Sequence, residues 1–256
     1  MGILNLTADS FFDGGKYNSL DLALNQTEKM INDGALFIDV GAASSKPGSP
    51  LISSEEEKKK LFPILEQLLK EFPSTYFSID TYNSEVAQTA LEMGASMIND
   101  ISGGQLDPQI IKTTARFKVP YIIMHMQGTP KTMQIQPQYT SLVNEIKLEL
   151  IQKVQNATSC GINDILIDPG FGFGKTVSDN YELLKHLSLF NDLNCPILVG
   201  LSRKSMIYKV LKGSAATALN GTTALHAWAL DRGAHILRVH DVKEAKECVD
   251  LWTALQ

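Results

Sequence analysis

Eight short apolar segments recur along the chain, and each is followed by a polar or glycine-rich stretch and then by a helix-length segment. Short apolar runs that alternate with helical patterns are typical of parallel β-strands buried on both faces. The pattern therefore predicts eight strands joined by helices. The predicted strands are Gly2–Leu6, Leu36–Val40, Thr75–Ile79, Ser96–Ile98, Val119–Met124, Ile165–Ile167, Ile197–Val199 and Ile236–Val239.

Five of the intervening helices have ends that can be read from the sequence. Glycine is favoured just after a helix, and proline stops one, so a periodic segment that meets either residue has a defined end. On this basis the predicted helices are Leu20–Asp33, Ser54–Phe72, Ser84–Met93, Tyr139–Cys160 and Thr217–Arg232.

Every predicted strand carries polar side chains at its end or just after it. A single aspartate after a strand is more often a helix cap than a catalyst, but eight strand ends of this kind indicate a shared site. Eight strand–helix units in 256 residues predict a single-domain α/β fold over residues 1–256, a (β/α)8 barrel with its chemistry at the carboxyl ends of the strands. An open doubly wound sheet is the alternative. The strand-end residues are Asn5, Asp39, Asp80, Asn99, His125, Asp168, Ser202 to Lys204, Arg238 and His240.

Composition and charge indicate which binding partners and which cellular compartment to expect. The net charge is −5 and no basic block is present, which argues against nucleic acid and favours small molecules. No apolar stretch reaches the roughly 18 residues that a membrane helix needs. The start of the chain lacks the features of a signal peptide, and three widely spaced cysteines fit neither a disulfide framework nor a zinc site. A cytoplasmic protein is therefore expected.

Seven motifs are spread from the first residue almost to the last: Met1–Gly15, Ser78–Thr81, Ile98–Gly104, Met124–Gln134, Asp168–Lys175, Gly200–Ser205 and Arg238–Asp241. Together they resemble the dihydropteroate synthase family. The resemblance implies a pterin-binding barrel that transfers a pterin-methyl group from a pyrophosphate to the aryl amine of p-aminobenzoate in folate biosynthesis. It also implies Mg²⁺, a homodimer and a sulfonamide target.

The resemblance also assigns roles to individual residues. It places Asp80, Asn99 and Asp168 at the hydrogen-bonding edge of the pterin, with Lys204 reaching a ring acceptor. Buried carboxylates of this kind are tolerated because the N–H groups of a pterin can bind them. Met124 and Phe173 are expected to form apolar walls against the ring faces, with core packing as the alternative role.

The remaining assignments concern the leaving group and the second substrate. The resemblance implies that Asn5 gives one oxygen ligand to Mg²⁺, an ion that usually takes its other ligands from phosphate and water. Arg238 and His240 bind the pyrophosphate, and the catalytic residues are Lys204, Arg238 and Asp13. Further residues in contact with substrate are Phe11, Ser45, Lys46, Pro47 and Ser205.

One loop departs from the pattern of the family. Asp39–Gly48 carries Ala43, Ser45 and Lys46 where the family has glutamate, threonine and arginine. Lysine keeps the positive charge but lacks the bidentate fork of arginine, so we expect altered affinity and a changed response to inhibitors.

Three alternative interpretations of the sequence compete with a dihydropteroate synthase. Gly170–Thr176 suggests a phosphate-binding loop, but the spacing would require a glycine at Pro169. The pterin domain of a corrinoid-dependent methyltransferase would share the barrel and the pterin-edge residues. It would not need the groups for Mg²⁺ and p-aminobenzoate, which are Asn5, Lys204, Ser205, Arg238 and His240. A catalytically silent paralogue that only binds a pterin is the third possibility.

Overall fold

The computed structural model describes residues 1–6, 16–43, 48–49, 51–133 and 137–256. Five predicted site residues lie outside these ranges, so their roles stay predictions: Phe11, Asp13, Ser45, Lys46 and Pro47.

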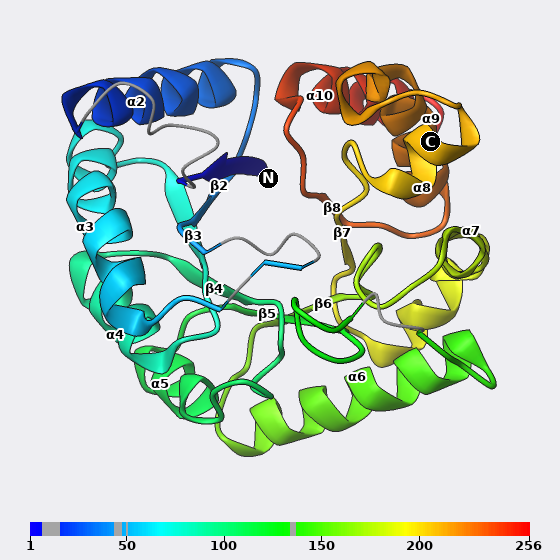
Figure 1. The fold of residues 1–256 in the computed structure, drawn as a ribbon, viewed down its shortest axis with the longest axis horizontal. Helices are drawn as coiled ribbons and strands as arrows, with labels where there is room; N and C mark the ends of the chain where they lie inside the picture. The colour runs from blue at the N-terminus through cyan, green and yellow to red at the C-terminus, as the bar shows by residue number, and fades with distance from the viewer. Residues whose placement is uncertain (7–15, 44–47, 50, 134–136) are drawn as a thin grey trace.

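Within these ranges, eight parallel strands form a closed ring surrounded by helices (Figure 1). Six of them pair in chain order, and β7 pairs with β8. The ring closes where Ile3 N donates to Val239 O at 2.9 Å and Ile167 N donates to Pro196 O at 3.0 Å. Closure confirms the predicted barrel and excludes the open sheet. The strands are β1 Gly2–Asn5, β2 Phe37–Gly41, β3 Tyr76–Asp80, β4 Met97–Asp100, β5 Tyr121–Met124, β6 Ile165–Asp168, β7 Leu198–Val199 and β8 Ile236–Leu237.

The helices cover the outside of the ring and largely follow the sequence pattern. The predicted helix Tyr139–Cys160 begins three residues later, at Leu142, and the predicted Thr217–Arg232 starts with a 3-10 turn. The α-helices are α2 Lys16–Asn32, α3 Ser54–Glu71, α4 Ser84–Met93, α5 Gln109–Phe117, α6 Leu142–Ser159, α7 Val177–Lys185, α8 Ser205–Val210, α9 Leu219–Asp231 and α10 Val242–Thr253, and the 3-10 helices are η1 Leu187–Leu193 and η2 Ala215–Thr217.

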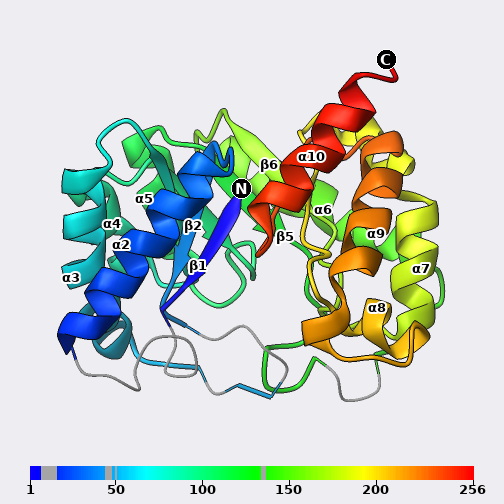
Figure 2. The same ribbon diagram turned by 90° about the horizontal axis from the view of Figure 1, so that it is seen from above.

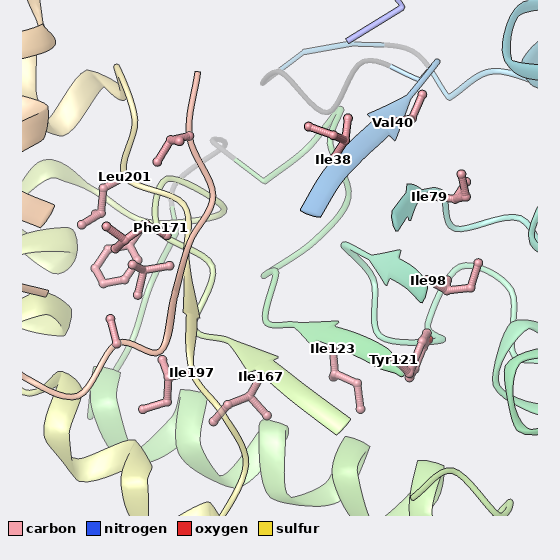
Figure 3. Packing of buried hydrophobic residues seen from close by; sticks show 14 of the residues in the cluster. Ile38, Val40, Ile79, Ile98, Tyr121, Ile123, Ile167, Phe171, Ile197 and Leu201 are labelled. Atoms are coloured by element: carbon pink, nitrogen blue, oxygen red, sulfur yellow. The ribbon is translucent and has the colours of Figure 1, made fainter. Parts of the chain in front are cut away.

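Alternation along the strands separates two environments. Side chains such as Ile38, Val40, Ile79 and Ile98 belong to the main core between the sheet and the helices (Figure 3). Their strand neighbours point to the other face, because successive side chains of a strand alternate. Met97, Ile122, Leu166 and Leu198 come from four strands and pack together as one layer inside the barrel.

The same alternation places polar residues inside the barrel, above this apolar layer. Asp80 is paired in register with Asn99, and Met124 is paired with Asp168. The strands run toward the edge of the barrel at which α8 begins (Figure 2). The carboxyl ends of the strands therefore bring distant polar residues to one place.

Within the described ranges, no helix has the length and apolar character needed to cross a bilayer.

Candidate active site

An arginine from the end of the barrel joins two carboxylates from its beginning. Arg238, just after β8, donates from Nε to Asp39 Oδ2 and from Nη2 to Asp80 Oδ2, both at 2.6 Å. Asn99 Nδ2 donates to the same Asp39 oxygen at 2.9 Å. Four residues from β2, β3, β4 and the β8 end thus form one hydrogen-bonded cluster inside the barrel.

The two buried carboxylates of the cluster, Asp39 and Asp80, share a single guanidinium, so one positive charge faces two negative charges. Burial raises the pKa of Asp80 to about 7, although Arg238 opposes the shift and the nearby Asp39 adds to it. Asp39 is fully buried, and its Oδ1 has no hydrogen-bond partner among the described residues. Orphaned buried acceptors are costly, so this oxygen is suited to receive a donor from a ligand.

Two more charged side chains, Asp168 and Lys204, come from the ends of β6 and β7, farther around the barrel. Asp168, at the end of β6, accepts a hydrogen bond from Gly170 N at 2.7 Å, and burial raises its pKa while Lys204 opposes the shift. Lys204 Nζ donates to Phe171 O and lies 4.7 Å from the centre of the Phe173 ring. Burial lowers the pKa of Lys204 to about 8, within reach of neutral pH.

Apolar side chains form the wall between these two groups. Met124 is buried in a cluster with Tyr82, Ile101 and Met126, and Phe173 packs against that cluster. A flat ring placed here would meet a thioether and an aromatic side chain, both of which favour such contact. The predicted wall residues are therefore neighbours, and contact with a ligand stays a prediction.

A cavity of about 410 Å³ opens beside Lys204. Its rim includes Ser202, whose Oγ lies 3.0 Å from Nδ1 of the exposed His240. Arg203 binds Asp241 with two hydrogen bonds, 2.8 and 2.7 Å, and so ties the loop after β7 to the loop after β8. The predicted site residues that line this cavity are Asn5, Phe173, Lys204, Ser205, Arg238 and His240.

The structure brings every described site residue of the prediction to this edge of the barrel. Asp80, Asn99, Met124 and Asp168 complete the set from the strand ends. Two further buried residues, Asp39 and Lys175, had no assigned role. The position of Asp39 at a strand end was a usable signal, whereas nothing local in the sequence showed which way Lys175 would turn.

The chain is similar to known proteins over almost its whole length. A family model described as "Pterin binding enzyme" matches residues 1–240. The curated dihydropteroate synthase from Escherichia coli is 43% identical to this chain, and the alignment covers 97% of this chain and 88% of that protein. The dihydropteroate synthase from Haemophilus influenzae is 40% identical, with coverage of 99% of this chain and 92% of that protein.

Solved structures give the same result. The Yersinia pestis dihydropteroate synthase with a sulfonamide drug complex superposes with a TM-score of 0.93 at 40% identity, covering 100% of this chain and 93% of its own. The Thermus thermophilus dihydropteroate synthase in complex with 4-aminobenzoate has a TM-score of 0.90 at 36% identity, with coverage of 100% and 93%. The chain therefore belongs to the dihydropteroate synthase family of pterin-binding enzymes.

Proposed function

We propose that the cluster around Arg238 and the cavity beside Lys204 form the catalytic centre of a dihydropteroate synthase. The enzyme is a transferase of folate biosynthesis that condenses 6-hydroxymethyl-7,8-dihydropterin pyrophosphate with p-aminobenzoate. The bond between the pterin methylene carbon and the pyrophosphate oxygen breaks, and its electron pair leaves with pyrophosphate. A carbon–nitrogen bond then forms to the aryl amine, which loses a proton, to give 7,8-dihydropteroate.

The carboxylates are suited to hold the pterin. Asp80, Asn99 and Asp168 present acceptors inside the barrel, and a pterin offers several N–H donors along one edge. Met124 and Phe173 would lie against the faces of the ring. The contact between Arg238 and Asp80 supports this proposal most directly, because it places the pterin-edge carboxylate and an anion-binding guanidinium side by side.

Arg238 would also stabilise the negative charge that develops on the leaving pyrophosphate. Preorganised charge in a site that excludes water is commonly the largest contribution to catalysis of this kind. His240 is held by Ser202 on the cavity rim and would bind the outer phosphate. Lys204 would donate to a ring acceptor of the pterin and exclude water above Phe173.

The residues present fit a magnesium ion. Asn5 reaches the cavity from the end of β1 and lines it together with Arg238 and His240. One amide oxygen beside a pyrophosphate site suits Mg²⁺, which keeps several waters and takes phosphate oxygens as ligands. When bound, the ion would neutralise charge on the leaving group.

We also propose a homodimer through α9 and α10. Three large apolar side chains, Trp228, Leu251 and Leu255, are exposed by 54%, 71% and 83% on or beside these helices. They border a broad hollow of about 970 Å³. A cluster of exposed large apolar side chains commonly marks a protein interface, and a second copy would offer a matching surface.

A direct assay tests the proposed reaction. Purified protein is mixed with the pterin pyrophosphate, p-aminobenzoate and Mg²⁺, and dihydropteroate is measured by mass spectrometry. Formation of product at a rate that depends on both substrates supports the proposal. Tight pterin binding without product would favour a methyltransferase-like or silent pterin-binding protein instead.

A further inference from the structure

A second lysine is buried under the active site, and the proposed reaction leaves it without a role. Lys175 is only 3% exposed. Its Nζ lies 2.8 Å from Gly170 O, 3.0 Å from Phe173 O and 2.9 Å from His125 Nδ1. An ammonium group has three N–H donors, and all three are used here. Burial lowers the pKa of Lys175 to about 7, and the carboxylate of Asp168 opposes that shift.

Two of the three acceptors belong to the loop that carries Lys175 itself, so this loop folds around its own lysine. Gly170 has a φ of 74°, and a Cβ added there would lie 1.9 Å from His125 O. Gly174 has a φ of 62°, and its Cβ would lie 2.8 Å from Gln127 Cβ. Glycine is required at both positions because side chains clash and the backbone is left-handed. The loop resembles a phosphate-binding loop in composition, but its lysine points inward to carbonyl groups.

The third acceptor ties the loop to the neighbouring strand and to the surface. His125 Nδ1 accepts from Lys175, so the ring carries its proton on Nε2, which faces Glu149 Oε2 at 3.3 Å. Burial lowers the pKa of His125 to about 4, which keeps the ring in the neutral form that this arrangement needs. Glu149 also pairs with Lys153 at 2.8 Å, and Lys153 Nζ donates to Met124 O at 3.0 Å.

The loop that Lys175 holds carries or contacts the parts of the site that meet the substrates. Asp168 lies at its start, and Phe173 lies within it. Phe171 O accepts the hydrogen bond from Lys204, while the Phe171 side chain is buried near Leu201 (Figure 3). A shift of the Gly170 or Phe173 carbonyl would therefore move a pterin-edge carboxylate, an aromatic wall and the support of Lys204 together.

We propose that Lys175 is a positioning residue for the transferase reaction: with His125 and Glu149 it holds the loop after β6 in the shape that aligns Asp168, Phe173 and Lys204. The proposal rests on the function proposed above. It also gives Lys175 an electrostatic effect, because its positive charge joins those of Lys204 and Arg238 in keeping Asp168 ionised.

The test compares Lys175→Met with Lys175→Arg in the synthase assay across pH. Methionine has a side chain of similar length, but it lacks the positive charge and the N–H donors of lysine. We expect kcat/KM for the pterin pyrophosphate to fall about 10- to 100-fold, because displacement of reacting groups by an ångström has effects of this size. The contribution of Asp168 to the acid limb of the pH profile should also move to higher pH, since loss of the charge raises the pKa of Asp168. The contribution of Asp80 to the same limb should stay in place. Arginine keeps the charge but cannot repeat the three contacts, so the rate should fall without a shift of the limb.

Two controls separate this effect from general damage. Lys185→Met removes an exposed lysine at the end of α7 and should behave as wild type. Leu68→Ala opens a cavity in the core beneath α3, across the barrel from the loop (Figure 1). It should lower the melting temperature without moving the acid limb. Urea unfolding at the assay temperature confirms that each variant is folded.

Wild-type kcat/KM and an unmoved acid limb in folded Lys175→Met would overturn the proposal. If that variant does not fold, Lys175→Arg decides, and a wild-type rate in Lys175→Arg overturns the proposal equally. Wild-type protein that makes no dihydropteroate would overturn the proposed function and this inference together. An active wild type with unaffected variants overturns the inference alone.

Discussion

Arg238 and Asp80 lie 158 positions apart in the sequence, yet Arg238 Nη2 donates to Asp80 Oδ2 at 2.6 Å. The contact joins the residue after the last strand to the end of the third. The same guanidinium holds Asp39, so the pterin-edge carboxylate of Asp80, the buried Asp39 and the proposed anion-binding group form one unit. A substitution at either residue should therefore affect the binding of both parts of the first substrate.

Asp80 makes pterin binding dependent on pH. A ligand that binds the ionised carboxylate must displace a proton below the pKa of about 7, so affinity should fall as the pH falls from 8 to 6. Asp80→Asn should bind more weakly at pH 8, by roughly 1.5–3 kcal/mol, and should lose most of this pH dependence. Calorimetry with a pterin that lacks pyrophosphate measures both effects. Asp164→Asn, on an exposed residue, is the control. Binding of Asp80→Asn within threefold of wild type at both pH values would contradict the assignment.

Magnesium should act on turnover more than on pterin binding. Chelation, or Asn5→Ala, should lower kcat by about 100-fold, as removal of a group that stabilises developing charge commonly does. Binding of a pterin without pyrophosphate should change little in the same samples. Asn163→Ala removes an exposed amide and should leave both quantities unchanged. Equal loss of turnover and binding would show that the metal has a structural role.

The surface on α9 and α10 should control association. Leu251→Glu places a charge on a residue that is 71% exposed beside the proposed interface. Burial of an unpaired charge opposes association, so sedimentation should show a shift from dimer to monomer at micromolar protein. Leu148→Glu alters a similarly exposed leucine, 58% exposed, on α6 and should leave the association state unchanged. Identical sedimentation of Leu251→Glu and wild type would remove this surface as the interface.

His226 should weaken the fold in acid. It is buried on α9, its Nε2 has no partner among the described residues, and burial lowers its pKa to about 4. The unfolded chain takes up a proton near pH 6.5 but the folded chain does not until about pH 4, so stability is lost across this interval as the pH falls. His226→Leu should remove about 1–3 kcal/mol of that loss. Urea unfolding at pH 7 and at pH 4.5 measures the difference in free energy of unfolding between His226→Leu and wild type. The same difference at both pH values would contradict this role of His226.

The positions of the strands and the candidate residues followed from local properties of the sequence. Continuous apolar runs located all eight strands, and the polar residues at their ends included Asp39, Asp80 and Arg238. Strand identity depends on residues within a few positions of one another, so a sequence pattern can report it. Element boundaries were less accurate, as the later start of α6 shows, because end positions depend on capping contacts and packing.

The tertiary structure decided which of these groups meet. Asp39 received no role from its sequence context, yet ring closure brings Arg238 of the final strand end within hydrogen-bonding distance of it. Lys175 follows three alternating glycines that suggest an anion-binding loop, but left-handed turns direct its ammonium to Gly170 O, Phe173 O and His125. Such pairings depend on the relative placement of segments far apart in the chain and on which buried donors find acceptors. No local pattern encodes that placement. A charged group becomes buried, and so needs a partner, only when the barrel closes around it.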